Sequence, residues 1–224
     1  MTAHTDKHFE AELKLLKEEI LKMGSLVEEM ITLSMKALED RSSAISKKVI
    51  QKDPEVNHLE MIIDDHCLEL LVRWQPAASD LRFITMSLKI SKDLERMGDL
   101  AVDICEQVLE LNWEPVLGTY DDFKEIGEKT REMVKNALDA FVKQDVELAN
   151  HVCTSDDEVD ALKRNMFHAM IALMQKDSTA VARGTRIILI SRHFERIADH
   201  ATNIAEQVIF MVKGEDIRHR GKTL

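Results

Sequence analysis

The sequence predicts an all-α protein built from two tandem three-helix bundles that are related by an internal duplication. The segment DLERMGDLAVDICEQV at residues 93–108 recurs without a gap as HFERIADHATNIAEQV at residues 193–208, and eight of the sixteen positions are identical. Apolar residues recur at helical spacing along most of the chain, and no segment favours a strand. Only seven glycines and three prolines interrupt the 224 residues, which favours long helices. A repeat spacing of one hundred residues indicates a duplicated domain-sized unit, because solenoid repeats are shorter.

Helix-breaking signals divide the first half into three principal helices. Asp53 and Pro54 predict a helix start, with the aspartate as cap and the proline in the first helical position. Gln75 and Pro76 predict the end of that helix. A bend at residues 41–43 and a short helix to about residue 51 precede it. The expected principal helices are therefore residues 6–40, 53–74 and 79–111.

The second half repeats this order after a linker at residues 112–119, which contains Pro115 and Gly118. Residues 36–39 recur at 136–139, whereas residues 53–56 resemble residues 156–159. The change of offset from 100 to 103 implies a three-residue insertion near the second-half bend. We expect the last helix to open near Ser178 and to end before Gly214. The expected divisions are a first repeat at residues 1–113, a second repeat at 119–214 and a polar C-terminal tail at 215–224.

Composition excludes several classes of protein. The net charge of −11 argues against a general nucleic-acid binder, which would present a basic surface. No apolar run approaches the roughly 20 residues that span a bilayer, and the N-terminus lacks a signal-peptide core. Cys67, Cys105 and Cys153 form neither a CxxC pattern nor an obvious disulfide framework. These features favour a location in a reducing cytoplasm.

The repeated segments carry acidic residues at helical spacing. Residues four apart on a helix are displaced by only about 40°, so an i, i+4, i+8 series forms one stripe. In the first half this stripe contains Glu95, Asp99 and Asp103; in the second half it contains Glu195, Asp199, Asn203 and Glu206. Like charges at this spacing repel. We expect a neighbouring arginine, cations of a partner helix or a bound metal to offset the repulsion.

Glu60 and Asp64 form a further Glu-x-x-x-Asp pair on the second helix of the first half. If they face the stripe on the third helix, the converging carboxylates form an oxygen-rich site for a hard or borderline cation. At the offset of 103, the second half has Lys163 and Phe167 in their place. A site there would be poorer, or would use Asp156, Asp157 or Asp160. The carboxylate count therefore predicts tighter binding in the first half. We expect no required cofactor; Fe, Mn, Mg and Zn are the candidate metals at the carboxylate stripes.

Motifs for catalysis are scarce. A di-iron bundle needs a Glu-x-x-His motif on each of two helices, and the only match is Glu55 to His58. The sequence contains no Walker A, HExxH or GxSxG motif. The Glu-x-x-x-Asp stripes keep a metal-dependent enzyme or a metal-storage bundle open as one interpretation of the chain. No glycine-rich anion site or arginine cluster is evident in the sequence.

The paired segments ERIADHATNIAE at 195–206 and LERMGDLAVDICE at 94–106 resemble the repeated signature of PhoU proteins. QPAASDLRFI at 75–84 and KGEDIRHR at 213–220 are also similar to this family, and the resemblance covers essentially the whole chain. It implies two three-helix bundles related by a pseudo-twofold axis. It also implies a cytoplasmic, commonly dimeric, non-enzymatic protein. A related family of phosphate-permease accessory proteins shares this bundle.

The resemblance further implies a negative regulator of the phosphate regulon. Its expected partners are the ATPase of the phosphate ABC transporter and the phosphate-sensing histidine kinase, with no nucleic acid and with membrane association only through these partners. Some members bind metal clusters through Glu/Asp-x-x-x-Asp motifs. Transferred to this sequence, the implied metal ligands are Glu60, Asp64, Glu95, Asp99, Asp103, Glu195, Asp199, Asn203 and Glu206. Asn203 departs from the motif because it lacks a carboxylate.

Overall fold

The computed structural model describes residues 3–76, 78–116 and 121–217, and all regular structure in these ranges is helical. The expected positions of the linker and tail fall partly outside them, at residues 117–120 and 218–224. The helices of the first half are α1 (Ala3–Glu39), α2 (Ser43–Ile50), α3 (Asp53–Trp74) and α4 (Ala78–Leu111). Those of the second half are α5 (Asp121–Lys143), α6 (Val146–Lys176), the 3₁₀ turn η1 (Ser178–Ala180) and α7 (Val181–Lys213).

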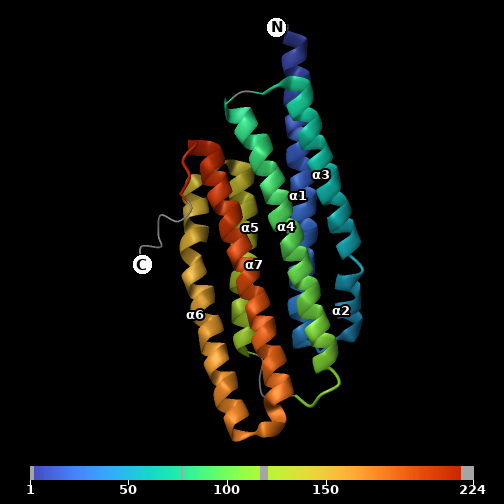
Figure 1. Cartoon of the computed structure of the whole chain (residues 1–224), viewed down its shortest axis with the longest axis vertical. Coiled ribbons are helices and arrows are strands. Elements are labelled where there is room, and N and C mark those ends of the chain that lie inside the picture. The colour runs from blue at the N-terminus through green and yellow to red at the C-terminus, as the bar shows by residue number, and fades with distance from the viewer. Residues whose placement is uncertain (1–2, 77, 117–120, 218–224) are drawn as a thin grey trace.

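The helices run along the long axis of an elongated molecule, and consecutive long helices are antiparallel (Figure 1). One bundle contains α1, α2, α3 and α4, and the other contains α5, α6 and α7. The two bundles lie side by side, with α4 packed against α7 and α1 packed against α5. The sequence-based fold class is therefore confirmed: the protein is all-α and contains two three-helix units.

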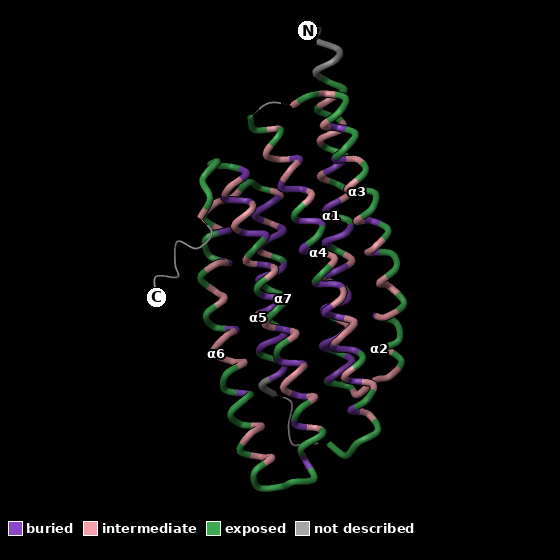
Figure 2. Tube along the Cα trace, viewed as in Figure 1, coloured by how far each residue is buried: buried purple, intermediate pink, exposed green. Residues whose placement is uncertain are grey.

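The repeated segments lie at the centre of this arrangement. Residues 93–108 belong to α4 and residues 193–208 to α7, so the two copies occupy matching places on the third helix of each half. Their apolar faces contribute fully buried residues such as Ala101, Ile104, Ala201 and Ile204 to one core that continues through both halves. Figure 2 shows that buried residues recur along α1, α4, α5 and α7, whereas α3 and α6 have broad exposed outer faces.

The helix boundaries follow local chemistry, with one correction. Asp53 is the first residue of α3 and not its cap; Lys52 is the cap residue, and it makes no side-chain capping bond. The Asp53 carboxylate instead accepts a hydrogen bond from Asn57 Nδ2 at 2.9 Å. At the other end of the chain, Gly214 ends α7 with a φ of +70°, the left-handed conformation that glycine tolerates.

Proline also explains the one difference in helix number between the halves. Pro54 has no amide hydrogen and cannot continue a helix through this point, so α2 ends and α3 begins there. At the offset of 103 the second half has Asp157, and α6 runs without a break from residue 146 to residue 176. No helix in the described ranges combines the length and apolar character needed to cross a bilayer.

Candidate functional site

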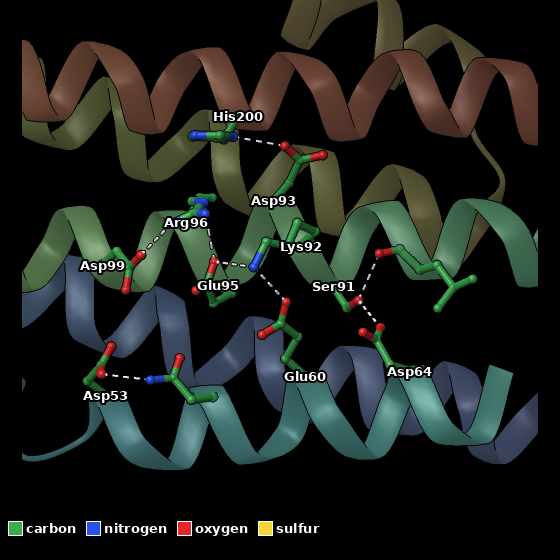
Figure 3. Close-up of polar contacts among 12 residues, drawn as sticks. Asp53, Glu60, Asp64, Ser91, Lys92, Asp93, Glu95, Arg96, Asp99 and His200 are labelled. Atoms are coloured by element: carbon green, nitrogen blue, oxygen red, sulfur yellow. Dashed lines mark hydrogen bonds and ion pairs between the residues drawn. The ribbon is translucent and has the colours of Figure 1, made fainter. Parts of the chain in front are cut away.

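The first-half carboxylates converge where α3 packs against α4, and cations of α4 lie between them (Figure 3). Lys92 Nζ lies 2.9 Å from Glu60 Oε1 and 3.1 Å from Glu95 Oε2, so one ammonium group joins the two helices. Arg96 lies 3.5 Å from Glu95 through Nε and 3.0 Å from Asp99 through an Nη atom. The repulsion within this stripe is therefore offset by side chains of the same helix.

Two further carboxylates border this group. Asp64 accepts a long hydrogen bond of 3.4 Å from Ser91, and burial together with the nearby Glu60 raises its pKa. Asp53, which the sequence analysis did not include, lies close enough to Asp99 for their repulsion to act together with burial in raising the Asp53 pKa. The site thus extends along α3 from residue 53 to residue 64.

Asp103 does not join this group. Its Oδ2 atom lies 3.7 Å from His193 Nδ1 on α7. The reason is helical drift: two steps of four residues rotate Asp103 by about 80° from Glu95, which turns it from α3 towards α7. In this structure Asp103 therefore lies against α7 and is not grouped with Glu60 and Asp64 as expected.

In the second half, Glu195 and Asp199 on α7 face Asp156 and Asp160 on α6. Lys163 Nζ lies 2.6 Å from Glu195 Oε1 and 3.5 Å from Asp160 Oδ1. Of the open alternatives, Asp156 and Asp160 are the α6 residues that couple electrostatically to Asp199. They occupy the places of Asp53 and Asn57 in the first half, at the offset of 103.

This second-half cluster retains more uncompensated negative charge. Burial is the largest cause that raises the pKa of Asp156 to about 6, and Asp199 and Asp160 add to it by repulsion. Burial and the neighbouring Glu195 also raise the pKa of Asp199, against weaker opposing effects of His200 and Lys163. Raised carboxyl pKa values are the expected consequence of crowding like charges in a partly desolvated site.

Asn203 lies elsewhere, on the side of α7 that faces α4, whereas Glu206 also lies close enough to Cys153 of α6 to add, after burial, to the raised pKa of that thiol. Asn203 Nδ2 donates to Asp93 Oδ1 at 3.3 Å, and Gln207 Nε2 donates to Asp93 Oδ2 at 2.7 Å. His200 Nδ1 lies 2.8 Å from Asp93 Oδ1, which makes His200 an interface residue (Figure 3). Glu206 lines a cavity of about 380 Å³ next to this network. The expected grouping of Asn203 with Glu195 and Asp199 is therefore not found.

The donor chemistry of both clusters suits a hard cation, but their present side-chain positions suit ion pairs. Among the residues that the structure describes, no three His, Cys, Asp or Glu side chains are placed to share one metal ion. Lysine and arginine occupy the space between the carboxylates in the first half, and Lys163 does so in the second. Coordination would require the carboxylates to rotate towards a common point and to displace these cations.

Comparison with known proteins matches both halves. The PhoU domain model matches residues 20–108 and again residues 123–208, and one match lies within each three-helix unit. The chain belongs to the PhoU family. This confirms the resemblance seen in the repeated segments, and the double match agrees with the duplication.

Relatives and solved structures of PhoU proteins are similar over nearly the whole chain. A Pseudomonas aeruginosa relative, named a phosphate-specific transport system accessory protein PhoU homolog, is 39% identical over 100% of this chain and 93% of its own length. The Escherichia coli K12 protein of that name is 32% identical over 99% of this chain and 92% of its own.

A crystal structure of PhoU from P. aeruginosa superposes with a TM-score of 0.90 at 38% identity, covering 92% of this chain and 100% of that one. A PhoU structure from Streptococcus pneumoniae, described as a phosphate transport system regulatory protein, superposes with a TM-score of 0.88 at 29% identity. It covers 93% of this chain and 99% of that one. The PhoU fold is therefore shared over more than nine-tenths of this chain. The names of these relatives describe accessory and regulatory proteins.

Proposed function

We propose that this chain is a cytoplasmic regulatory adaptor of phosphate uptake that represses the phosphate regulon when phosphate is plentiful. Its partners in this role are the ATPase of the phosphate ABC transporter and the phosphate-sensing histidine kinase. The observation that carries the proposal is similarity over the full length to PhoU proteins named as accessory proteins of the phosphate-specific transport system. Membrane association would arise only through these partners, and the family resemblance favours a homodimer.

The architecture supports a role in binding and not in catalysis. Most buried residues of α4 and α7 are apolar and pack within each bundle and between the two, whereas α3 and α6 leave long outer faces for partners. The three cysteines are poor nucleophiles, because burial is the largest cause raising the pKa of Cys67 and Cys105 to about 12 and that of Cys153 to about 11. These features support an adaptor without enzymatic activity.

A reporter for phosphate-starvation genes combined with affinity capture tests the adaptor role. In a strain that lacks this chain we expect the reporter to be active at high phosphate, and re-expression of the chain should silence it. The tagged chain should retain the transporter ATPase and the kinase from the same cells, in amounts that change with phosphate supply. A reporter that is silent without the chain, or retention of neither partner, would refute the adaptor role.

We further propose that the carboxylates of the second half can bind a divalent or ferric ion. The carboxylate count favoured the first half, but the contacts favour the opposite order. A metal in the first half must displace both Lys92 and Arg96 from short contacts, whereas in the second half Lys163 holds Glu195 and Asp160, and Arg164 reaches Asp160 only at 3.8 Å. The residues that would hold the ion are Asp156, Asp160, Glu195 and Asp199, and the ion would relieve their mutual repulsion.

Metal analysis of protein purified without chelator tests this part. We expect Asp199→Asn to lose more bound metal than its pseudo-equivalent Asp99→Asn, and Asp103→Asn to lose none. A larger loss for Asp99→Asn would restore the ranking by carboxylate count. If no sample contained metal even after addition of Mn²⁺ or Fe³⁺, the carboxylates would be ion-paired surfaces only, and the metal-storage and metal-enzyme alternatives would fail with the metal site.

A further inference from the structure

The groove between α6 and α7 is lined by cationic side chains from both helices. It has a volume of about 650 Å³, and Lys163, Arg164 and His168 of α6 lie across it from Arg192 and Arg196 of α7. Each of these pairs, Arg164 with His168 and Arg192 with Arg196, is spaced by four residues, so both members lie on one face of their helix. The cluster is not evident from the sequence because the α6 residues lie about thirty positions before Arg192 and Arg196 and meet them only through packing.

The duplication provides an internal comparison for this groove. At the offset of 103, the α3 residues that correspond to Lys163, Arg164 and His168 are Glu60, Met61 and Asp65. Ten groove positions can be compared, those of α6 at the offset of 103 and those of α7 at the offset of 100. The first half has five acidic and two basic residues at them, and the second has two acidic residues, four basic residues and a histidine. The cationic character is therefore specific to the second half and is not a general property of the fold.

The two arginines of α7 also differ from their first-half counterparts in their contacts. Lys92 pairs with Glu60 and Glu95, and Arg96 pairs with Glu95 and Asp99. Over the ranges that the structure describes, neither Arg192 nor Arg196 has a carboxylate within 4.0 Å, although both are exposed. Lys163 already neutralises Glu195 at 2.6 Å. Two guanidinium groups thus line the groove without a carboxylate within ion-pair distance, although Asp199 also lines it.

An aromatic ring completes the groove. Phe167 is 44% exposed and lines the same cavity, beside His168 and the apolar Ile188. The ring of Phe167 lies 5.7 Å from that of His168 in an edge-on arrangement. In the first half this place is taken by Asp64, a half-buried carboxylate.

We propose that the groove between α6 and α7 binds a nucleoside di- or triphosphate, with its phosphates on Arg192 and Arg196 and its base against Phe167. Guanidinium groups bind phosphate oxygens in bidentate geometry, and an exposed aromatic ring provides a stacking surface for a base. A groove of this volume lies in the range of sites for small organic ligands and is far larger than inorganic phosphate requires. Arg164, which reaches Asp160 only at 3.8 Å, is available to contact the terminal phosphate.

Titration calorimetry with the full-length protein in EDTA tests the proposal, and EDTA removes any contribution from bound metal. ATP should bind more tightly than inorganic triphosphate, and triphosphate more tightly than adenosine. Arg192→Gln combined with Arg196→Gln should weaken ATP binding at least tenfold. Phe167→Ala should weaken ATP but not triphosphate. The matched control, Lys92→Gln combined with Arg96→Gln, changes the pseudo-equivalent first-half positions and should leave ATP binding unchanged.

Three results would overturn the proposal. The first is absence of ATP binding at millimolar concentration. The second is equal weakening by the α7 pair and by the α4 control pair, which would indicate an unspecific charge effect. The third is equal affinity for ATP and triphosphate, which would remove the role assigned to Phe167. Circular dichroism of each variant establishes that it is folded, and the surface position of these residues favours that outcome.

Discussion

The seam between α3 and α4 and the seam between α6 and α7 occupy equivalent places in two copies of one unit, but they handle charge in different ways. In the first seam, Lys92 of α4 pairs with Glu60 across the seam and with Glu95 on its own helix, and Arg96 pairs with Asp99 along α4. In the second, Lys163 serves two carboxylates, and the arginines of α7 face a groove. The two copies therefore share their helix packing but differ in the charged side chains along the two seams.

This difference shows which part of a duplicated protein is free to change. The apolar faces of α4 and α7 are buried against each other, so substitutions there alter both halves at once. Glu60 and Lys163 lie outside the apolar core and take part in ion pairs, so a glutamate and a lysine can occupy this equivalent position without disturbing the core. We therefore expect stability to be common to both halves and ligand binding to be specific to one.

The largest expected effect tests the shared core. Leu94→Ala and the pseudo-equivalent Phe194→Ala should each destabilise the protein by about 2–5 kcal/mol, because both side chains are fully buried. Since α4 and α7 belong to one continuous core, each variant should lower a single unfolding transition that includes both halves. Differential scanning calorimetry provides the measurement. Two separate transitions, with only one shifted by each variant, would show that the halves unfold as independent domains.

Much of this comparison could be predicted from the sequence. The repeated segments, Pro54, the Gln75-Pro76 break and Gly214 depend on local backbone chemistry, and helix positions followed from them to within a few residues. The duplication then placed the two repeated segments on equivalent helices, because an ungapped repeat preserves the buried face.

The composition of the sites could be predicted less well. Asp103 and Asn203 are in the expected i, i+4 series, but a helix turns about 40° over four residues, and this drift moves both towards the other half. Sequence spacing also gives no information on which cation lies between two carboxylates. The α6 arginine and the α7 arginines are distant in sequence and meet only through packing.

A smaller effect is expected where the two halves meet. Asp93 of α4 accepts hydrogen bonds from Asn203 and Gln207 and contacts His200, whereas its counterpart His193 has only a 3.7 Å approach to Asp103. Asp93→Ala should cost about 1–3 kcal/mol, because it leaves several donors of α7 without an acceptor in a half-buried seam.

The matched substitution His193→Gln should cost about 0.5 kcal/mol or less, because a contact of 3.7 Å is too long for a hydrogen bond. Urea unfolding of the two variants measures the difference. Equal costs would indicate that packing, and not the Asp93 network, determines the stability of the seam. A double variant of Asp93→Ala and Gln207→Leu should recover part of the loss, since it removes a donor together with its acceptor.

The smallest effect concerns the uncompensated charge of the second half. The folded-state pKa of Asp156 is about 6, against 3.8 for an ordinary aspartate, so the folded protein holds its proton more tightly than the unfolded chain. The favourable contribution is complete below about pH 4 and is lost as the pH rises towards 6. In chelator-treated protein, Asp156→Asn should therefore be more stable than wild type at pH 7, by about 1 kcal/mol after allowance for solvent screening. Its advantage should disappear near pH 4.

The first-half control is Asp53→Asn, and its gain should be smaller. Asp53 lies at the first position of α3, where the helix dipole favours a negative charge, and it accepts a hydrogen bond from Asn57. Thermal midpoints from pH 4 to pH 8 for both variants provide the comparison. One contrary result would be that Asp156→Asn lowers the thermal midpoint at pH 7; another would be that its midpoint changes with pH in the same way as that of wild type. Either result would mean that the charge of Asp156 is compensated and that the two seams are electrostatically alike. A gain confined to Asp156→Asn would locate the unbalanced charge in the α6–α7 seam, next to the groove proposed to bind nucleotide.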